Sequence, residues 1–306
     1  MAKAKHIAVL MGGWSPERDV SLVSGEECAQ ALHQLGYQIS KIDANQQLAQ
    51  ELSEVKPDIC FNALHGVGGE DGAVQGLLEV MKIPYTHSGV RASSLAMDKH
   101  LAKQIFAAAG LPIAPSMLVV PSELPKGEIA HPMPPPYVVK PINQGSSIGV
   151  EIVKSGSNKV PASLHPESKF GVMMVENYVA GRELTCAVMG DTVLDVLEIT
   201  AASGFYDYHA KYTPNGSRYE VPAKIDAALA QEIQHCALTA HQVLGCRGVT
   251  RTDFRYDVDG AGLAVLELNT QPGMTPSSLM RKIAAHRGIN YPDLVQWIAE
   301  DASCQR

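Results

Sequence analysis

The sequence predicts an α/β amino-terminal unit with a parallel sheet, followed by a two-part α+β region with antiparallel sheets. In the first hundred residues, short apolar runs alternate with helical patterns, which is typical of a doubly wound parallel sheet. Residues 112–141 then hold nine of the 19 prolines. After them, apolar runs follow one another in pairs, which is typical of hairpins rather than of a second parallel sheet.

The amino-terminal unit is built from predicted strands that alternate with predicted helices. Its strands are expected at residues 6–11, 38–42 and 58–64, and its helices at 21–35, in the polar stretch before residue 58, and at 73–81. Ligands bind beyond the carboxyl ends of the strands in such sheets. The loops at residues 12–19 and 65–72 follow two of these strands, so functional side chains are expected in them.

The second half of the chain opens with a helical pattern at residues 98–109, which Asp98 begins and Gly110 ends. Beyond the prolines, strands are expected at residues 137–140, 150–153, 172–175, 183–189, 193–199, 249–258 and 263–268, a long helix at 224–244, and two short helices at the end. A polar loop occupies residues 200–222. We therefore expect three domains, at residues 1–97, 98–180 and 181–306.

The composition is that of a globular protein and excludes several classes of function. Of the 306 residues, 45% are hydrophobic and 19% are charged, and the net charge of −7 provides no basic surface for nucleic acid. No apolar stretch approaches the ~18 residues of a membrane span, and the first apolar run is too short for a signal peptide. The six cysteines lack CxxC or zinc-ligand spacing, which fits reduced thiols in the cytoplasm.

The most informative motif is a predicted hairpin that carries charged residues. Asp253 and Glu267 each lie seven residues from Gly260, at the centre of the turn. A symmetric hairpin therefore places these two carboxylates opposite each other. The same register places Arg251 opposite Asn269. Because side chains alternate along a strand, all four polar side chains are expected on one face of the hairpin.

The other face of this hairpin is expected to be apolar, with Phe254, Leu266 and Leu268 on it. Two carboxylates and an amide oxygen on one face repel one another unless a cation lies between them. Oxygen ligands of this kind are those that Mg²⁺ prefers, usually with phosphate oxygens completing its shell. The hairpin therefore predicts a magnesium site, and the alternative is a solvated polar face.

A second motif predicts a phosphate site without a standard nucleotide-binding sequence. The chain has no GxxxxGK[ST], HRD or DFG motif, which excludes P-loop NTPases and protein kinases. Lys140 ends an apolar strand before the loop at residues 145–149, whose backbone N–H groups are suited to phosphate oxygens. This loop also matches the GxSxG pattern of serine hydrolases at Ser147, but a strand is predicted after it where that class needs a helix.

Seven short motifs occur in order along almost the whole chain, at residues 11–21, 64–72, 97–99, 140–147, 205–212, 251–253 and 267–275. Together they resemble the D-alanine–D-alanine ligase family. The resemblance implies an ATP-grasp fold, with ATP held between two antiparallel sheets. It implies ligation of two D-alanines to D-alanyl-D-alanine for peptidoglycan, through a D-alanyl phosphate, with release of ADP and phosphate. It also implies a cytoplasmic homodimer that binds neither nucleic acid nor membrane.

The resemblance assigns roles to individual residues. The implied ligands of Mg²⁺ or Mn²⁺, with two ions per active site, are Asp253, Glu267 and Asn269. The residues implied to bind ATP are Lys99, Lys140, Ser147, Glu176, Val179, Glu183 and Lys211, of which Glu176 and the Val179 backbone read adenine and Glu183 the ribose. The residues implied to bind the two D-alanines are Glu17, His65, Ser278 and Leu279. The implied catalytic set is Glu17, Ser146, Tyr212, Arg251 and Gly273.

These roles suit a reaction in which a carboxylate is activated by phosphoryl transfer and then attacked by an amine. Arg251 and the N–H of Gly273 would stabilise the tetrahedral oxyanion. Glu17 would bind the ammonium of the first D-alanine and connect through Ser146 to Tyr212. Residues 200–222 would form a lid that protects the acyl phosphate from water. Tyr212 favours the dipeptide over a D-alanine–D-lactate product.

The chain departs from the family pattern in two places. Pro161 and Pro166 interrupt a region where the family usually has a full helix, so a different packing is expected in that part of the domain. Tyr178 stands where tryptophan is common, near the implied adenine site. The alternative functions are a D-alanine–D-lactate ligase, another ATP-grasp carboxylate–amine ligase, and a non-catalytic nucleotide-binding module, which would lack the metal face.

Overall fold

The amino-terminal part of the chain forms a parallel sheet with the strand order β2-β1-β3. The computed structural model describes residues 5–125, 130–202, 206, 211 and 216–305. In it, strands alternate with helices in the order β1 (His6–Met11), α1 (Arg18–Gln34), β2 (Gln38–Asp43), α2 (Leu48–Val55), β3 (Ile59–Asn62) and α3 (Ala73–Met81). The predicted alternation is confirmed, and the predicted bounds of β1 and α3 are those observed.

Both faces of this sheet are covered, which explains why β1 is a continuous apolar run. Ile7 and Val9 pack in a core cluster with Leu32 of α1, whereas Ala8 and Leu10 pack in another with residues of α2 and α3. The loops after β1 and β3 leave the same edge of the sheet, because the strands are parallel. Residues 12–17 and 63–72 are therefore brought together at this edge.

Two antiparallel sheets follow. The larger has the order β10-β9-β8-β11-β12, and the smaller has the order β4-β7-β5-β6. The larger sheet contains β8 (Arg182–Met189), β9 (Thr192–Ala201), β10 (Ser217–Glu220), β11 (Val249–Asp257) and β12 (Gly262–Asn269). The smaller contains β4 (Ser116–Val119), β5 (Tyr137–Pro141), β6 (Glu151–Val153) and β7 (Met173–Asn177). The predicted fold class, an α/β unit followed by antiparallel sheets, is confirmed.

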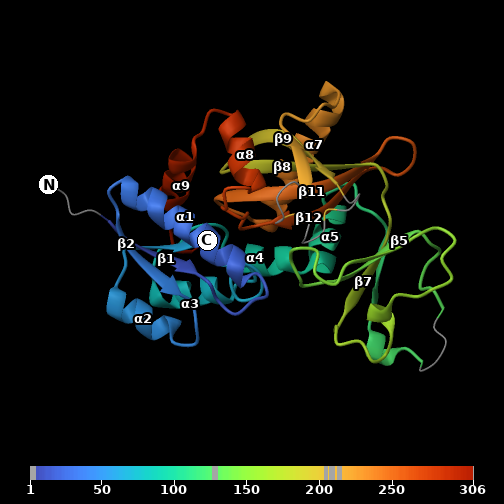
Figure 1. Cartoon of the computed structure of the whole chain (residues 1–306), viewed down its shortest axis with the longest axis horizontal. Coiled ribbons are helices and arrows are strands. Elements are labelled where there is room, and N and C mark those ends of the chain that lie inside the picture. Colours follow the sequence, from blue (N-terminus) through green and yellow to red (C-terminus); the bar gives the residue numbers. More distant parts are fainter. Residues whose placement is uncertain (1–4, 126–129, 203–205, 207–210, 212–215, 306) are drawn as a thin grey trace.

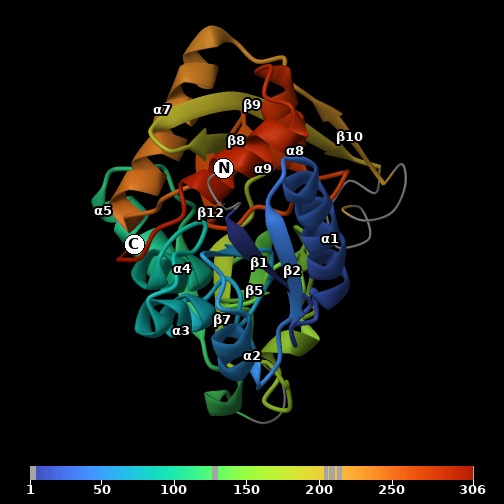
Figure 2. The ribbon, with the colours of Figure 1, turned by 90° about the vertical axis from the view of Figure 1, so that its left-hand side faces the viewer.

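Helices join the three sheets into one molecule. The remaining helices are α4 (Val90–Met97), α5 (Lys99–Ala108), α7 (Ala227–Leu244), α8 (Leu279–His286) and α9 (Tyr291–Glu300). Figure 1 shows the parallel sheet at one end of the long axis, β5 and β7 at the other, and the larger sheet between them. α9 packs against α1, and Figure 2 shows α8 and α9 beside it. The carboxyl-terminal helices therefore hold the first sheet against the larger antiparallel sheet.

Several elements were not expected from the sequence, and most predicted boundaries differ from the observed ones by one to three residues. α4 lacks strong apolar periodicity, and β4 lies within the proline-rich passage, so neither was predicted. The segment predicted as a polar loop at residues 200–222 contains β10, which pairs with an extended β9. Cross-strand pairing, which sequence spacing does not display, turns part of that loop into sheet. The division into domains at residues 97 and 180 stays a prediction.

Candidate active site

Two adjoining pockets lie where the three sheets meet, and among the described residues they gather every side chain assigned a role above. Pocket A lies between the two antiparallel sheets, with Val138, Lys140 and Glu176 on one side and Glu183, Asp253 and Glu267 on the other. Pocket B lies between the parallel sheet and the larger sheet, with Glu17, His65 and Ser146 facing Arg251, Gly273 and Ser278. Both pockets are lined by Tyr206, Lys211 and Glu267. Tyr212 lies outside the described residues.

A buried charge cluster forms the floor of pocket A. Glu176 on β7 pairs with Lys140 on β5 and with Lys103 on α5, and the Lys103 Nζ to Glu176 Oε2 distance is 2.5 Å. The Glu176 side chain is 3% exposed and that of Lys103 is 2% exposed. Burial acts to raise the pKa of Glu176, but Lys140 and Lys103 outweigh it and lower that pKa. Glu176 is therefore ionised, and one lysine more than its charge requires remains for an anionic ligand.

The hairpin has the predicted register where it carries charge. Asp253 pairs with Glu267, and Arg251 pairs with Asn269. The register shifts by one residue beyond Asp253, because Phe254 pairs with Val265. Such a bulge re-aims the extra residue of its strand.

The predicted apolar face of the hairpin is correct in two of its three residues. Phe254 and Leu268 are buried in a core cluster with residues of α7. Leu266, in contrast, lines pocket A beside Glu267, so its placement on the opposite face was wrong. The extra residue that the bulge inserts in β12 breaks the alternation at this point. Leu266 thereby gives pocket A an apolar surface against its charged wall.

Asp253 accepts four hydrogen bonds from three side chains. Arg251 donates from Nε and Nη2 to its two carboxylate oxygens, each at 2.8 Å. Thr185 Oγ1 donates to Oδ1 at 2.6 Å, and Asn269 Nδ2 donates to Oδ2 at 3.0 Å. Burial disfavours the charge on Arg251, but Asp253 outweighs burial and raises the pKa of the guanidinium. This carboxylate is therefore fixed in place.

Glu267 is surrounded by lysines from three parts of the chain. Lys99, the first residue of α5, places Nζ 3.1 Å from Glu267 Oε2 and donates to the Gln144 carbonyl at 2.7 Å. Burial alone would raise the pKa of Glu267, but Lys99, Lys211 and Lys140 lower it to about 2. The point where both pockets meet therefore combines a permanent carboxylate with convergent positive charge, which suits a ligand bearing phosphates and a metal.

The residues predicted to hold a divalent metal fit that task in their chemistry. Asp253 and Glu267 supply carboxylate oxygens. Asn269 directs its amide nitrogen to Asp253 and to the Arg251 carbonyl, which leaves its oxygen as the atom it offers to a cation. The described residues contain no cluster of three or more His, Cys, Asp or Glu side chains suited to a metal. Two carboxylates with substrate phosphates are nevertheless the usual setting for Mg²⁺. The donor set is thus complete only with a phosphate-bearing ligand.

Glu17 sits at the amino terminus of α1 but does not cap that helix. Its carboxylate makes no capping hydrogen bond and instead accepts one from the Ser146 hydroxyl. An added Cβ at Gly145 would lie 2.7 Å from Glu17 Oε2, and one at Gly66 would lie 2.8 Å from it. Burial and the charge of Glu70 raise the pKa of Glu17. The carboxylate is therefore confined at the edge of pocket B, and a ligand cation would relieve its repulsion with Glu70.

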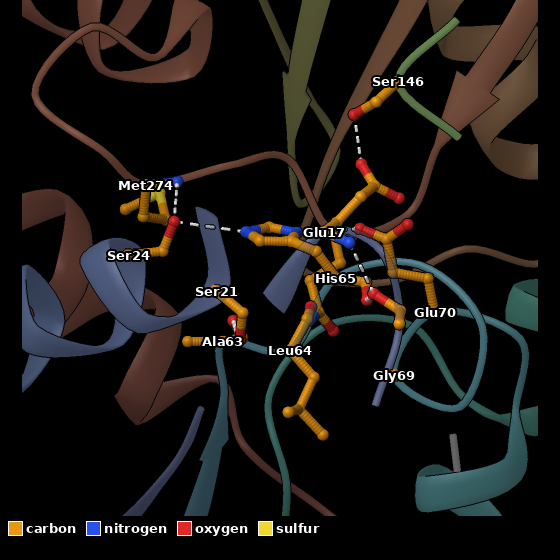
Figure 3. Close-up of polar contacts among 12 residues, drawn as sticks. Glu17, Ser21, Ser24, Ala63, Leu64, His65, Gly69, Glu70, Ser146 and Met274 are labelled. Carbon is orange, nitrogen blue, oxygen red and sulfur yellow. Dashed lines mark hydrogen bonds and ion pairs between the residues drawn. The ribbon is translucent and has the colours of Figure 1, made fainter. Parts of the chain in front are cut away.

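His65 lies beside Glu17 and is held at both ring nitrogens (Figure 3). Nδ1 lies 2.9 Å from Glu70 Oε1, and Nε2 lies 3.1 Å from Ser24 Oγ. Burial disfavours the charged ring, but Glu70 outweighs burial and raises the pKa of His65. Glu70 belongs to the motif at residues 64–72 but had no assigned role. Nothing in the sequence singled out Ser24 as a functional residue beyond its place on a predicted helix.

The far wall of pocket B is formed by residues 273–279. An added Cβ at Gly273 would lie 3.2 Å from Ser278 Oγ and 3.9 Å from two atoms of the His65 ring. Leu279 is the first residue of α8, and helix amino termini favour carboxylates. With Arg251 opposite, this wall offers hydrogen-bond donors, while Glu17 and Glu70 offer acceptors. Such a division of charge suits a zwitterionic amino acid.

The outer end of pocket A combines apolar and polar side chains. Val179 is buried, and its carbonyl accepts from Arg255 Nε at 3.1 Å. Arg255 also contacts Glu183 at 3.3 Å, and burial raises the pKa of Glu183 to about 7 in spite of this partner. The Arg255 guanidinium lies over the Tyr178 ring, 5.8 Å from its centroid. The tyrosine that departs from the family pattern therefore stacks with an arginine.

The loop between β5 and β6 is not a nucleophile elbow. Ser146 and Ser147 have φ values of 50° and 59°, and β6 rather than a helix follows the loop. The Ser147 hydroxyl donates to the Tyr206 carbonyl at 3.1 Å. The serine hydrolase alternative is therefore excluded. The shape of this loop comes instead from two consecutive residues in a left-handed conformation, which is typical of functional sites.

The departure at Pro161 and Pro166 is visible in the structure. Between β6 and β7 the chain forms one short 3₁₀ turn, Ala162–Leu164, where the family was expected to have a full helix. Leu164 is buried in the core of the smaller sheet, so this turn still covers that sheet.

The described helices include none that could cross a membrane. All six cysteines are free, and five of them are buried.

Comparisons with known proteins agree with this geometry. The family models for the carboxyl-terminal and amino-terminal parts of D-ala D-ala ligase match residues 105–300 and 40–88. A D-alanine–D-alanine ligase of Parvibaculum lavamentivorans is 55% identical over 311 residues, which covers 100% of both chains. The crystal structure of a D-alanine–D-alanine ligase from Bacillus anthracis has a TM-score of 0.83 at 32% identity, covering 97% of each chain. A structure of that protein complexed with ATP has a TM-score of 0.82 at 29% identity, again covering 97% of each chain.

The fold of these neighbours is the ATP-grasp fold, which the resemblance implied. Pocket A lies between the two antiparallel sheets of this chain. From the matches to both parts of the family model, and from full-length relatives well above 30% identity, the chain belongs to the D-alanine–D-alanine ligase family.

Proposed function

We propose that the protein joins two D-alanines into D-alanyl-D-alanine, with conversion of ATP to ADP and phosphate, and so supplies the dipeptide for peptidoglycan precursors. One observation carries this proposal: a pocket rich in lysine adjoins a pocket with separated acidic and basic walls, and they share Glu267 and Lys211. A phosphoryl donor and an amino acid carboxylate can meet only at such a junction.

Pocket A is proposed to bind ATP. Lys99, Lys140 and Lys211 hold its phosphates, Glu176 and the Val179 backbone read adenine, Glu183 contacts the ribose, and Ser147 shapes the phosphate loop. Asp253, Glu267 and Asn269 hold the divalent metal, proposed as two Mg²⁺ or Mn²⁺ ions, which neutralise phosphate charge during transfer. Because Lys140 pairs with Glu176 in this structure, Lys103 is the partner that keeps Glu176 neutralised when Lys140 turns toward phosphate.

Pocket B is proposed to bind the two D-alanines. Glu17 accepts from the ammonium of the first, with Ser146 as its neighbour and His65 beside it. A carboxylate oxygen of this D-alanine attacks the γ-phosphorus, and the bond to the β–γ bridging oxygen breaks, giving D-alanyl phosphate and ADP. Ser278 and the amino terminus of α8 at Leu279 bind the carboxylate of the second D-alanine.

The second D-alanine then attacks as a free amine. Its lone pair forms the C–N bond, the carbonyl becomes a tetrahedral oxyanion, and Arg251 and the Gly273 N–H stabilise that charge. Collapse of the oxyanion expels phosphate, and the ammonium proton is lost to solvent or a base. Tyr212, which lies outside the described residues, is proposed to act with Ser146 and to favour the dipeptide over D-alanyl-D-lactate. The lid proposed for residues 200–222 excludes water from the acyl phosphate.

The proposal extends to the setting of the enzyme. Five buried free cysteines and the need for ATP favour the cytoplasm. The protein is proposed to act as a homodimer, without binding nucleic acid or membrane.

The direct test is ADP release by the purified protein with ATP, Mg²⁺ and D-alanine, with mass-spectrometric identification of the product. We expect ADP formation that depends on D-alanine, is absent with L-alanine, and is lost in Glu267→Ala. Addition of D-lactate as a competing nucleophile tests the nearest alternative. A folded, ATP-binding protein that releases no ADP with D-alanine, or that forms mainly D-alanyl-D-lactate, would overturn the proposal.

A further inference from the structure

A buried serine on the first helix connects His65 to the backbone next to Gly273. Ser24 of α1 is 0% exposed, and its Oγ lies 3.1 Å from His65 Nε2 and 3.3 Å from the backbone nitrogen of Met274 (Figure 3). Ser24 has no role in the function proposed above. Its hydroxyl is nevertheless a point where the first sheet unit contacts the wall of pocket B, as Gln271 does where it donates to the Leu64 carbonyl.

The direction of the bond to Met274 is fixed, and that of the bond to His65 depends on the tautomer of the ring. The Met274 N–H can only donate, so Ser24 Oγ accepts from it. In the tautomer that carries its proton on Nδ1, toward Glu70, the hydroxyl proton is available for His65 Nε2. The charged groups that face this ring are Glu70, Glu17 and Arg251.

The backbone of Met274 is held from the other side as well. The Tyr291 hydroxyl, on α9, donates to the Met274 carbonyl at 3.1 Å. The residue before Met274 is Gly273, where an added Cβ would already lie 3.2 Å from Ser278 Oγ. A small displacement of Met274 would therefore move Gly273 relative to both Ser278 and His65.

We propose that Ser24 is a positioning residue for the second D-alanine: it anchors the Gly273–Met274 backbone against the His65 ring, so that the Gly273 N–H and Ser278 keep a fixed spacing. This inference rests on the proposed function, which places the oxyanion at Gly273. Ser24 touches no substrate in this account and acts through His65 and Met274.

Ser21 provides a matched control on the same helix. It is also 0% exposed, and its hydroxyl donates to the Ala63 carbonyl at 2.8 Å, but it contacts neither His65 nor Met274 among the described residues. Ser24→Ala and Ser21→Ala each remove one buried hydroxyl from α1. Any general loss of packing or helix stability should be similar in the two variants.

The test compares the full-length variants by steady-state kinetics and by ¹⁵N NMR of the His65 ring. For Ser24→Ala we expect the KM for the second D-alanine to rise about tenfold, with the KM for ATP within about twofold of wild type, as for loss of one buried hydrogen bond. In a pH titration, the Nε2 resonance of the neutral ring should shift in Ser24→Ala relative to wild type. Ser21→Ala should change neither quantity.

Two outcomes would overturn the inference. One is a Ser24→Ala enzyme with a wild-type KM for the second D-alanine and an unchanged His65 resonance. The other is an equal effect of both substitutions, which would show a purely structural role for each serine. The NMR measurement does not depend on turnover, so a protein that fails to make dipeptide would refute the proposed function while the contact between Ser24 and His65 is still tested.

Discussion

Removal of Lys103 tests whether the buried charge cluster of pocket A is held together as the structure indicates. Lys103 lies on α5, away from the junction of the two pockets, and its Nζ is 2.5 Å from Glu176 Oε2. Lys103→Met keeps the length and most of the volume of the side chain. It removes one of the two cations that neutralise Glu176 and leaves Lys140 as the other.

The expected loss of stability follows from burial. Breaking a buried ion pair by removing one partner typically costs ~3–5 kcal/mol, because the remaining charge is left without compensation. Here Lys140 retains part of that compensation, and burial already disfavours the charge on Lys103 and lowers its pKa. The free energy of unfolding should therefore fall by about 3 kcal/mol, at the lower end of the range.

The assay is urea unfolding of the ligand-free protein, with an exposed pair as the control. Lys41 and Glu26 form an ion pair at 2.8 Å whose side chains are 50% and 58% exposed. Lys41→Met should change the free energy of unfolding by less than about 1 kcal/mol. The double variant Lys103→Met/Glu176→Gln should recover about half of the loss, because an amide needs no countercharge.

The pH dependence has a defined sign. The pKa of Glu176 lies below its ordinary 4.5 in the folded protein, so the unfolded chain takes up the proton first as the pH falls. The stabilisation is complete above pH 4.5 and is lost as the pH falls through the folded pKa. The difference between wild type and Lys103→Met should therefore narrow under acidic conditions. If Lys103→Met matches Lys41→Met in stability at neutral pH, the reasoning about this cluster is wrong.

Three further predictions concern the two pockets. Burial raises the pKa of Glu183 from 4.5 to about 7, so Glu183→Gln should be more stable than wild type by about 3 kcal/mol at roughly pH 8 and close to it near pH 5. A lower stability than wild type at pH 8 in urea unfolding would contradict this. Gly145→Ala places a Cβ 2.7 Å from Glu17 Oε2, so the KM for the first D-alanine should rise about tenfold. The affinity for ATP, measured by calorimetry, should be unchanged. Equal effects on both ligands would refute the assignment of Glu17 to the first D-alanine. Chelation of divalent metal should abolish ADP release, and added Mg²⁺ should restore it in wild type but not in Glu267→Ala; metal-independent turnover would contradict the metal site.

Local patterns predicted most of the elements and the charged face of the hairpin. The parallel strands are short apolar runs whose two faces are both buried, so composition alone locates them. The pairing of Asp253 with Glu267 follows from counting residues to the turn. The bulge beside Asp253 cannot be counted in this way, and it is what places Leu266 in pocket A.

Residue spacing and composition could not predict contacts between residues that are far apart in the sequence. Ser146 meets Glu17 across 129 residues, and Lys103 meets Glu176 across 73. In the sequence, Glu17 resembles an ordinary acidic residue at a helix start, and Lys103 resembles a polar residue on a helix surface. Only the family resemblance singled out Glu17. Lys103 and Ser24 became visible once packing placed them against a charged or hydrogen-bonding partner.

The most direct test of the account follows oxygen through the reaction. D-alanine labelled with ¹⁸O in its carboxylate is incubated with the enzyme, ATP and Mg²⁺, and the released phosphate is examined by ³¹P NMR or mass spectrometry. Attack of the carboxylate on the γ-phosphorus predicts that one labelled oxygen passes into the phosphate for each dipeptide formed. Dipeptide formation with phosphate that carries no label would contradict the acyl phosphate route and, with it, the roles proposed for the junction of the two pockets.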